Sequence, residues 1–491
     1  MPHAVSFHLN DTPVVDAQAR PTTTLLEYLR EHRRLTGTKE GCAEGDCGAC
    51  SVVILDPDGP DGASYRAVNA CLVLLPMVQG RRVYTVEGLR ERTGAYHPVQ
   101  EVLVRELGSQ CGYCTPGVVM AMFEACYRDD LREAWQLDDQ MCGNLCRCTG
   151  YRPIRDAARA VAGTRPEDRF SKGLVEARPA ALEFQREQGS RVYATPATFE
   201  QLWALLAAHP QAKLICGGTD LSLTLTKKFV DLPELVSLEA LPGLRGVTRV
   251  DGGWRIGATT TLADLEAFAG RAGPTFVPIL RMLRYFASRQ IKNRATIGGN
   301  LCNASPIGDM APVLMGLNGR VELRSAAGTR TVALDEFFLA YRQTALKAGE
   351  ILAGVVVPEL ASDARAAAYK VSKRRELDIS TVAGGFCVEV DAANKVTAAR
   401  LCFGGMAATT ARARQLEAAL VGRAWTSAEV EAALPALARD FEPIDDARGS
   451  AWYRRTVAEN LVRGFVLETQ SVAVPQQAQR PSGTVHLEVV S

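Results

Sequence analysis

The sequence predicts an α+β protein of several domains, and three observations carry this prediction. Eight of the fourteen cysteines fall into two groups of four within the first third of the chain. Apolar residues alternate as in β-strands near the N-terminus and change to helical spacing from about Thr85. Beyond about Arg191, strand-like runs end in glycine pairs at 217–218 and 298–299. A chain of 491 residues has room for about three domains of roughly 150 residues each.

Composition excludes several classes of protein. Apolar residues make up 47% of the chain, and 56 basic residues balance 55 acidic ones without a basic block. A nucleic-acid partner is therefore not expected. Residues 1–11 lack the runs of a secretory signal, and no stretch of about 18 apolar residues predicts a membrane-spanning helix. We expect a soluble cytoplasmic protein with no membrane partner, in which clustered cysteines bind metal rather than form disulfides.

The first group of cysteines has the spacing of a plant-type 2Fe-2S ferredoxin, C-x4-C-x2-C followed by a distant fourth cysteine. The candidate ligands are Cys42, Cys47, Cys50 and Cys71. Glycines at 41, 45 and 48 let the loop backbone curl around a metal cluster, because glycine tolerates positive φ. The alternative, a zinc site, usually shows paired C-x2-C knuckles and fits this spacing poorly.

Residues 1–84 are predicted to form a β-grasp domain of the ferredoxin type. Residues 5–9 alternate as a strand, and Asn10-Asp11 supplies a hairpin turn. A short amphipathic helix is expected around residues 25–29, and residues 51–55 are predicted to form the strand that leaves the cysteine loop. Strand, helix, cysteine loop and strand follow one another in the order of that fold.

Residues 85–165 are predicted to form a four-helix bundle around the second group of cysteines. The helical pattern begins after a start signal at 97–98 and resumes after each cysteine pair. Its first apolar stripe contains Val99, Val102, Leu103 and Leu107. The candidate ligands are Cys111, Cys114, Cys146 and Cys148. From spacing alone this set could hold a 2Fe-2S cluster or zinc. The remaining six cysteines are interpreted as packing residues: Cys126, Cys142, Cys216, Cys302, Cys387 and Cys402.

The rest of the chain is predicted to contain a linker, two α+β regions and a tail. Residues 166–190 are charged and weakly patterned, as in a linker. Residues 191–360 mix strands with glycine-rich turns, and residues 361–470 have the pattern of strands followed by helices. Residues 471–491 are rich in Gln and Pro and are expected to form an arm.

Three motifs resemble those of the molybdenum hydroxylases. They are KEGCAEGDCGAC at 39–50, QCGYCTPG at 110–117 and NLCRCTGY at 144–151. The resemblance extends to about residue 470, and the order of the domains resembles the small subunit of the bacterial xanthine dehydrogenases within that family. It implies a 2Fe-2S cluster in both cysteine sets and FAD in residues 191–360, in a domain of the vanillyl-alcohol-oxidase type. A G-x-G-x-x-G motif after a strand is absent, so a Rossmann dinucleotide site is not indicated.

The resemblance also implies which residues bind the flavin. The first flavin loop contains Leu214, Ile215, Cys216, Gly217, Gly218, Thr219, Asp220 and Leu221. The second flavin segment, residues 286–309, contains Phe286, Thr296, Gly299, Asn300, Asn303, Ser305 and Asp309. Later contacts are Leu352, Lys370 and Asp378. Asp378 belongs to a loop, 373–379, that lies beside the flavin ring in relatives. Its charge would tune the flavin and nicotinamide pocket, or the loop is a solvated basic turn.

The family implies an electron-transfer function. Electrons would pass from a molybdenum centre through the second and then the first cluster to FAD, and finally to NAD+, as hypoxanthine or xanthine is oxidised to urate. No catalytic residue for the purine chemistry is expected on this chain. Molybdopterin would belong to a large partner subunit, in an α2β2 heterotetramer. Two alternatives stay open: the same subunit of a hydroxylase for aldehydes or N-heterocycles, and a free-standing iron–sulfur flavoprotein carrier.

Overall fold

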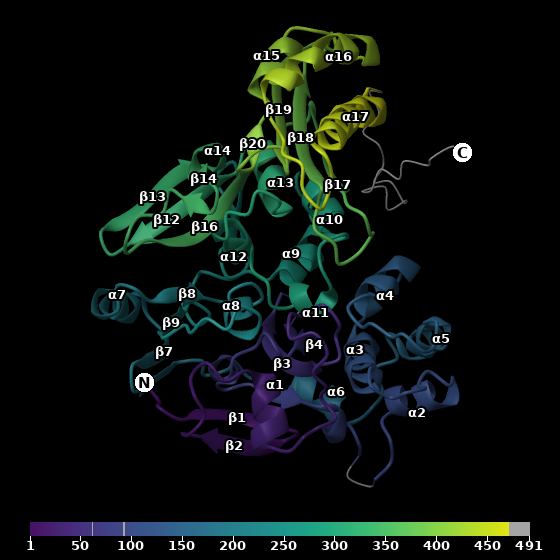
Figure 1. Cartoon of the computed structure of the whole chain (residues 1–491), viewed down its shortest axis with the longest axis vertical. Helices are drawn as coiled ribbons and strands as arrows, with labels where there is room; N and C mark the ends of the chain where they lie inside the picture. The colour runs from purple at the N-terminus through teal and green to yellow at the C-terminus, as the bar shows by residue number, and fades with distance from the viewer. Residues whose placement is uncertain (61, 92–93, 471–491) are drawn as a thin grey trace. The chain divides into compact units, whose positions relative to one another are not determined.

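The computed structural model describes residues 1–60, 62–91 and 94–470, so the predicted arm at 471–491 lies outside the described residues. The chain divides into two compact units, whose elements are labelled in Figure 1. The first unit contains Met1–Gly243 and Ala287–Ala295, and the second contains Leu244–Phe286 and the described residues from Thr296 onward. Each unit has its own sheets and its own buried core.

A five-stranded sheet in the order β2-β1-β5-β3-β4 opens the first unit. Its strands are β1 (Val5–Leu9), β2 (Thr12–Asp16), β3 (Ser51–Gly59), β4 (Gly62–Asn69) and β5 (Arg82–Tyr84). The predicted hairpin of β1 and β2 is confirmed, and Asn10 and Asp11 adopt the positive φ angles, 52° and 64°, of a tight hairpin turn. The short turns and helix around this sheet are α1 (Leu25–Glu27), η1 (Tyr28–His32), η2 (Leu75–Val78) and η3 (Val86–Gly88).

Four helices follow, and each cysteine pair of the second set lies between two of them, as the sequence predicted. They are α2 (Pro98–Arg105), α3 (Thr115–Tyr127), α4 (Ala134–Met141) and α5 (Arg152–Val161). α2 starts at the predicted signal, because the His97 ring accepts the N–H of Val99 at 3.3 Å and so caps the helix. Leu107 is 76% exposed and lies beyond the end of α2, so its predicted place in the apolar stripe is wrong.

The segment predicted as a linker carries secondary structure. α6 (Arg169–Val175) is capped by Asp168, whose Oδ1 accepts the N–H of Phe170 at 2.9 Å. β6 (Phe184–Gln188) is the edge of a second sheet, β6-β7-β9-β8. Phe170 and Phe184 are both buried and hold these two elements in place. The sequence did not predict the elements because the residues around each phenylalanine are mostly charged or polar. The other elements here are β7 (Arg191–Thr195), α7 (Phe199–Ala208), β8 (Lys213–Ile215), α8 (Ser222–Thr226) and β9 (Glu234–Ser237).

One short helix joins the first unit from much later in the sequence. α11 (Arg289–Lys292) begins where Ser288 Oγ accepts the N–H of Ile291 at 3.3 Å. It packs against β4 and α4, and therefore touches both the first sheet and the four-helix region. Figure 1 shows it above β4 and beside α4.

The second unit contains two larger sheets, β10-β11-β16-β12-β13 and β17-β18-β19-β20, and the ribbon β14-β15 (Figure 1). The strands are β10 (Val247–Val250), β11 (Gly253–Gly257), β12 (Arg320–Ser325), β13 (Gly328–Ala333), β14 (Phe338–Ala340), β15 (Gln343–Thr344), β16 (Ile351–Pro358), β17 (Ala364–Val371), β18 (Val382–Val390), β19 (Val396–Gly404) and β20 (Ala411–Arg412). Strand β18 contacts both α13 (Met310–Gly316) and α17 (Ala451–Thr469), which explains why it is apolar along nearly its whole length.

The second unit also contains ten helices and short helical turns in its described residues. They are α9 (Leu262–Ala269), η4 (Pro274–Phe276), α10 (Val277–Leu283), α12 (Ile297–Cys302), α14 (Leu334–Phe337), α15 (Arg414–Leu420), α16 (Ser427–Ala433) and η5 (Leu434–Arg439), besides α13 and α17. The predicted order of strands followed by helices in residues 361–470 is confirmed. Among the residues that the structure describes, no helix has the length and apolar character needed to cross a membrane.

Candidate iron–sulfur and flavin sites

The first cysteine loop, residues 41–50, is folded tightly around one thiol. Cys42 Sγ accepts three backbone N–H groups, from Glu44, Asp46 and Cys47, at 3.4, 3.3 and 3.4 Å. Positive φ angles at 43, 45 and 48 bend the backbone around the sulfur. Inward-pointing amides of this kind stabilise a thiolate, which is the form that binds iron.

The four thiols of the first set meet as two pairs. Cys50 Sγ and Cys71 Sγ lie 3.4 Å apart, and Cys42 interacts with Cys47. The interaction with Cys47 lowers the pKa of Cys42, and the three backbone amides lower it further. Burial acts in the opposite direction, and the resulting pKa is about 5. The same interaction, followed by burial, raises the pKa of Cys47. Each iron of a 2Fe-2S cluster takes two thiolates, so a two-by-two arrangement fits that cluster.

The second set also meets as two pairs, Cys111 with Cys148 and Cys114 with Cys146. Burial and the interaction with Cys146 raise the pKa of Cys114 to about 12. Cys111 and Cys148 are exposed, whereas Cys146 is 6% exposed. No group of three or more His, Cys, Asp or Glu side chains within residues 1–60, 62–91 and 94–470 is arranged for a single metal ion. The paired thiols again fit two irons.

The other cysteines were predicted to pack in the interior. Cys126, Cys387 and Cys402 are buried, as predicted, and Cys142 donates its thiol to Asp139 O at 3.2 Å at the end of α4. Cys302 is exposed, so its predicted burial is wrong. It lies at the last position of α12, whose buried residues are Ile297, Gly298 and Leu301. Cys216 is partly exposed.

The two cysteine loops touch each other within the first unit. The N–H of Leu145 donates to Cys47 O at 3.0 Å, and Asn144 Nδ2 donates to Gly48 O at 3.1 Å. Cys47 is a candidate ligand of the first cluster, and Leu145 immediately precedes Cys146, a candidate ligand of the second. A single hydrogen bond therefore joins the backbones of the two candidate ligand sets.

Three glycines permit this contact. A Cβ on Gly48 would lie 2.1 Å from Gly143 O, and a Cβ on Gly117 would lie 2.1 Å from Gly48 O. Gly48 also has a φ of 68°, which other residues adopt only with strain. The sequence predicted a role for Gly48 in curling the loop, but it did not reveal Gly117 or Gly143 as contact positions. The backbone at Gly48 therefore lies closer to the backbones at Gly143 and Gly117 than a Cβ would allow.

The predicted first flavin loop, residues 214–221, lies beside the first cysteine set in the same unit. Ser222 Oγ, at the end of this loop, donates to Leu72 O at 2.8 Å, next to the candidate ligand Cys71. Lys227 Nζ donates to Cys42 O at 3.3 Å and lies 3.2 Å from a carboxylate oxygen of Glu44. Neither Ser222 nor Lys227 was predicted from the sequence as a site residue.

The glycine pair of this loop is required by protein packing. A Cβ on Gly217 would lie 1.9 Å from Arg294 O, and Gly218 has a φ of 78°. Leu214, Thr219 and Leu221 are half-buried, Ile215 is buried and Asp220 is exposed. The loop thus leaves some of its residues accessible at the end of β8 while its glycines contact the backbone of the first unit.

The predicted contacts of the second flavin segment, at 286 and 296–309, belong to the second unit, whereas residues 287–295 belong to the first. Thr296 caps α12, and its Oγ1 accepts the N–H of Gly299 at 3.1 Å. Gly299 is exposed. Asn300 Oδ1 is buried and has no hydrogen-bond partner in the described part of the chain. An unsatisfied buried acceptor costs about 1–3 kcal/mol, so this amide fits a donor group supplied by a ligand. Three further predicted contacts are half-buried: Phe286, Asn303 and Ser305.

Two predicted flavin contacts pair with each other instead of pointing freely into a site. Lys370 Nζ lies 2.7 Å from Asp309 Oδ2, and Ser380 Oγ donates to Asp309 Oδ1 at 2.5 Å. The side chains of Lys370 and Asp309 are only 3% and 8% exposed. Leu352 in β16 is 3% exposed and lies opposite Leu323 of β12. Contacts of these residues with flavin stay predictions.

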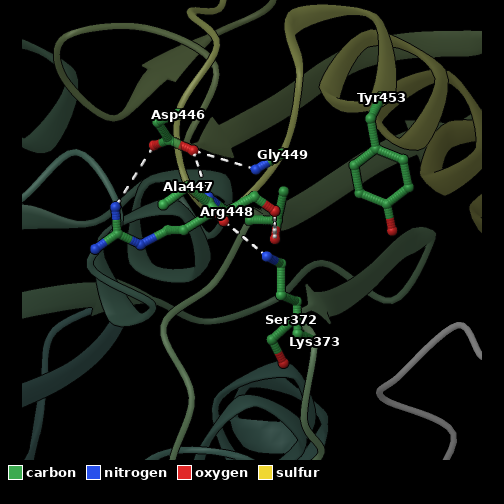
Figure 2. A pocket seen from close by; sticks show the side chains of 8 residues that line it. Ser372, Lys373, Asp446, Ala447, Arg448, Gly449 and Tyr453 are labelled. Atoms are coloured by element: carbon green, nitrogen blue, oxygen red, sulfur yellow. Dashed lines mark hydrogen bonds and ion pairs between the residues drawn. The ribbon is translucent and has the colours of Figure 1, made fainter.

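A pocket of about 430 Å³ lies beside the loop predicted to neighbour the flavin ring (Figure 2). It is lined by Ser372, Lys373, Thr381, Asp446, Ala447, Arg448, Gly449 and Tyr453. Lys373 Nζ donates to Ala447 O at 2.7 Å and ties the loop to the opposite wall. Asp378 Oδ2 accepts the N–H of Arg374 at 2.8 Å, so this carboxylate organises the loop backbone.

Four family models match consecutive parts of the chain. They are a 2Fe-2S iron-sulfur cluster binding domain (residues 7–75), a 2Fe-2S binding domain (85–159), the FAD binding domain in molybdopterin dehydrogenase (183–360) and the CO dehydrogenase flavoprotein C-terminal domain (367–469). The chain carries the iron–sulfur and flavin region of a molybdenum hydroxylase. The cofactors of this molybdenum hydroxylase region are two 2Fe-2S clusters and FAD.

Curated relatives of this molybdenum hydroxylase region are oxidoreductases. Xanthine dehydrogenase of Emericella nidulans is 35% identical over 519 residues, which cover 92% of this chain and 38% of that protein. Xanthine dehydrogenase/oxidase of Rattus norvegicus is 33% identical over 514 residues, which cover 94% of this chain and 38% of that protein. The chain therefore spans less than half the length of these relatives.

Solved structures resemble a smaller part of the chain. A carbon monoxide dehydrogenase of Hydrogenophaga pseudoflava aligns with 56% of this chain and 95% of its own chain, with a TM-score of 0.52 and 28% identity. Quinoline 2-oxidoreductase of Pseudomonas putida 86 aligns with 56% of this chain and 95% of its own, with a TM-score of 0.50 and 26% identity. In both cases about half of this molybdenum hydroxylase region corresponds to a whole chain.

Proposed function

We propose that this chain conducts electrons from a molybdenum centre to NAD+ in a xanthine dehydrogenase, during oxidation of hypoxanthine and xanthine to urate. One observation carries the proposal, a series of contacts inside the first unit. The second cysteine loop bonds to the first through Leu145 and Cys47, and the first set bonds to the predicted flavin loop through Leu72 and Ser222. Cofactors held there would follow one another in the order second cluster, first cluster, FAD.

The proposed cofactor ligands are those of the sequence analysis. The first cluster takes Cys42, Cys47, Cys50 and Cys71, and the second takes Cys111, Cys114, Cys146 and Cys148, each as two pairs of thiols. The sheet order β2-β1-β5-β3-β4 supports a β-grasp fold for residues 1–84, and four helices support a bundle for 85–165. We retain the vanillyl-alcohol-oxidase type for residues 191–360 and a separate C-terminal domain at 361–470.

For the flavin, the proposal rests on the chemistry of the predicted residues within each unit, taken by itself. Bound FAD accepts electrons singly and releases two together as hydride, which is the chemistry that NAD+ requires. In the second unit, the exposed Gly299 and the unpaired amide oxygen of Asn300 would hold polar groups of the cofactor. Asp378 would act by shaping the loop at 373–379 through its bond to the N–H of Arg374.

A molybdopterin-bearing large subunit is the proposed partner, in an α2β2 heterotetramer. Large apolar side chains next to the second cysteine set support docking there: Tyr113, Leu145 and Tyr151 are 49%, 45% and 46% exposed. Cys111 and Cys148 are themselves exposed, so a cluster at this position would be accessible to a donor on the partner. These features argue against the free-standing carrier, which needs no apolar face around its entry point.

The experiment uses this chain purified anaerobically with its partner. Xanthine should bleach the visible absorbance of the clusters and flavin, and NAD+ should then restore it. Dithionite serves as the control that reduces every centre without a substrate. Full bleaching by dithionite with no response to xanthine would reject the purine assignment. Bleaching by xanthine without recovery on adding NAD+ would reject NAD+ as the acceptor.

A second candidate substrate class comes from the similarity to quinoline 2-oxidoreductase. The same chain could serve a hydroxylase for N-heterocycles or aldehydes, because substrate is selected on the partner. In the experiment above, bleaching by quinoline or an aldehyde in place of xanthine would favour this alternative. The electron route through this chain would be the same.

A further inference from the structure

The segment at 288–294 is almost entirely polar and almost entirely buried. Its six polar residues are at most 9% exposed: Ser288, Arg289, Gln290, Lys292, Asn293 and Arg294. Burying polar groups costs free energy unless each finds a partner. These residues lie within the predicted second flavin segment, 286–309, although none of them was predicted as a flavin contact, and their side chains are used within the first unit.

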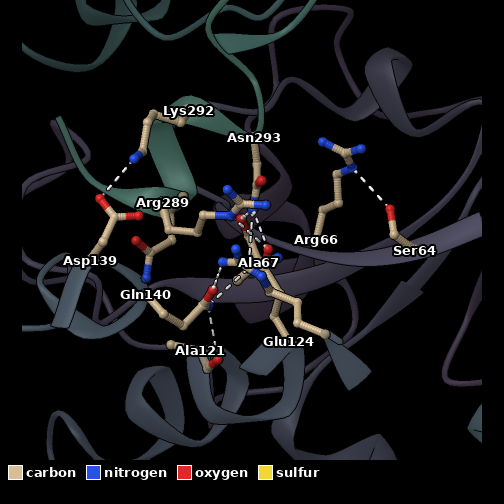
Figure 3. Close-up of polar contacts among 12 residues, drawn as sticks. Ser64, Arg66, Ala67, Ala121, Glu124, Asp139, Gln140, Arg289, Lys292 and Asn293 are labelled. Carbon is tan, nitrogen blue, oxygen red and sulfur yellow. Dashed lines mark hydrogen bonds and ion pairs between the residues drawn. The ribbon is translucent and has the colours of Figure 1, made fainter. Parts of the chain in front are cut away.

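Part of the segment converges on Glu124 of α3 (Figure 3). Arg289 Nε and Asn293 Nδ2 each donate to Glu124 Oε1 at 3.1 Å, and Asn293 Nδ2 also donates to Ala67 O of β4 at 2.8 Å. Burial opposes ionisation of Glu124, but the charges of Arg289 and Arg128 lower its pKa. α11 therefore fastens the four-helix region to the first sheet around a buried carboxylate.

A second fastening lies between α11 and α4. Lys292 Nζ lies 2.7 Å from Asp139 Oδ1, and their side chains are 0% and 9% exposed. Figure 3 shows this pair separate from the residues around Glu124. Two independent buried contacts thus hold the short helix in one place and orientation.

A further side chain of the segment, Gln290, reaches the contact between the cysteine loops. Its Nε2 donates to Asn144 Oδ1 at 2.7 Å, and Asn144 Nδ2 donates in turn to Gly48 O at 3.1 Å. A Cβ on Gly143 would lie 2.1 Å from Gln290 Oε1, so the approach of Gln290 requires the glycine there. Gln290 is 1% exposed and Asn144 is 4% exposed. Both ends of the Asn144 amide are therefore fixed.

We propose that Gln290 is a positioning residue that sets the separation of the two iron–sulfur clusters, acting through Asn144 on the loop at Gly48. The inference rests on the proposed cluster ligands and goes beyond them, because Gln290 touches neither set of thiols. Electron transfer between two centres slows steeply as their separation grows. A helix fixed by Glu124 and Asp139 is a rigid support from which to hold two loops at one distance.

The test is Gln290→Leu in the full chain with both clusters present. Leucine has nearly the same size but cannot donate to Asn144. The readout is the magnetic interaction between the two reduced clusters in low-temperature EPR, which depends on their separation and orientation. We expect both cluster signals to persist with a reduced splitting, and electron transfer between the clusters to slow.

The matched control is Gln140→Leu. Gln140 is also a buried glutamine of this network, 0% exposed, and its Nε2 donates to Ala121 O at 3.0 Å and to Glu124 at 3.1 Å. It does not bond to Asn144, so the splitting should stay as in the wild type even though more hydrogen bonds are lost.

An unchanged splitting in Gln290→Leu, or an equal change in both variants, would overturn the inference. If Gln290→Leu fails to retain its clusters, Gln290→Asn takes its place, because that side chain keeps an amide but is too short to reach Asn144. The iron content distinguishes a failure of the proposed cluster ligands from a failure of the role of Gln290. Wild-type chain without two clusters would reject the proposed ligands, whereas two clusters with unaltered coupling in the variants would reject only the role of Gln290.

Discussion

At the scale of single residues, the contact between the cysteine loops depends on the absence of side chains. Gly48 and Gly117 bring backbone atoms to distances at which a single methyl group would overlap a carbonyl oxygen. Most glycines in tight turns are explained by their φ angle, but Gly117 lies in helix α3 and has ordinary helical geometry. Its role is therefore purely one of space.

Gly117→Ala tests that role. Alanine favours a helix over glycine by about 1 kcal/mol, so without the contact the variant would be more stable. Because its Cβ would lie 2.1 Å from Gly48 O, we expect destabilisation instead, of about 1–3 kcal/mol, and partial loss of cluster iron. Calorimetry and iron analysis of the purified chain provide the measurement.

Gly464→Ala is the control for helix propensity. Gly464 lies inside α17, and a Cβ there would meet nothing within 4 Å. This variant should raise the melting temperature of the second unit, by a stabilisation of up to about 1 kcal/mol. A rise for both variants would show that the loops can separate freely and that the close contact is unimportant.

The two cysteine sets could be singled out from the sequence because metal ligation imposes residue type and spacing together. The structure brings the thiols of each set together in pairs, and their binding of iron stays a prediction. The sequence did not identify Asn144 or Gln290, because nothing in a polar residue's identity says whether it is buried. The prediction that Leu107 belongs to the apolar stripe was wrong because the helix ends before this residue. Its spacing suited a helix face, but α2 ends at Arg105 and leaves it in solvent.

At the scale of elements, α11 is the least predictable part of the fold. Four residues are too few for a hydrophobic period, and the motif around them resembled a flavin segment. The structure divides that segment, with α11 in the first unit and α12 in the second. Tertiary partners such as Glu124 and Asp139, far away in the sequence, determine where α11 packs.

Lys292→Met tests the attachment of α11 to α4. Removing one member of a buried ion pair leaves Asp139 as an uncompensated charge, which costs about 3–5 kcal/mol. We expect a corresponding fall in the stability of the first unit by chemical denaturation. The double variant Lys292→Met with Asp139→Leu should recover most of the loss, because two apolar side chains of similar volume need no partner. A double variant as unstable as the single one would contradict this account.

Another element depends on a charged pair, in the second unit. Arg330 of β13 donates from Nε and Nη2 to Glu350 at 2.7 and 2.8 Å, and Glu350 also accepts the N–H of Lys347 at 2.8 Å. The guanidinium group of Arg330 is the main cause that lowers the pKa of Glu350 from 4.5 to about 2. The pair therefore holds β13 against the turn that leads into β16.

The pH dependence follows from that shift. Because the pKa of Glu350 is lower in the folded chain, the pair stabilises the fold fully above about pH 4.5, and this stabilisation is lost as the pH falls toward 2. Glu350→Gln should therefore melt at a lower temperature than the wild type at neutral pH, and the difference should shrink at about pH 3. A difference that is constant with pH would mean that charge plays no part.

At the scale of the whole molecule, two clusters in series mean that loss of one cluster should block electron transfer across it while the steps on its far side continue. Cys148→Ser removes one exposed candidate ligand of the second cluster. We expect the loss of about half of the iron, with the EPR signal of the first cluster retained. With the partner present, reduction of NAD+ by substrate should fall to background.

The same variant should keep the other half of the route. NADH should still reduce the flavin, and a dye that accepts electrons from flavin should still be reduced at nearly the wild-type rate. Loss of both activities would mean that Cys148 supports the fold as a whole. Retention of substrate-driven NAD+ reduction would mean that electrons reach the flavin without the second cluster.

At this scale the order of strands and helices was the most predictable feature, because the segments around each cysteine group and those after residue 361 leave local patterns in the sequence. The elements inside the predicted linker, α6 and β6, were not, since each is anchored by one buried aromatic residue, Phe170 or Phe184, in charged surroundings. The division of the later segment between two units was also not predictable, because it depends on packing between residues more than a hundred positions apart.

The position of α11 late in the sequence has a consequence for the synthesis of the protein on the ribosome. Asp139 and Lys292 are 153 residues apart, so a ribosome adding about 5–20 residues per second needs roughly 8–30 s to reach the lysine after the aspartate. From Cys148 onward, which is nearly all of that interval, both sets of cysteines have been synthesised, but the helix that fastens their domains has not. A nascent chain that receives iron early must do so before α11 joins the four-helix region to the first sheet. The timing of translation therefore becomes part of cofactor assembly.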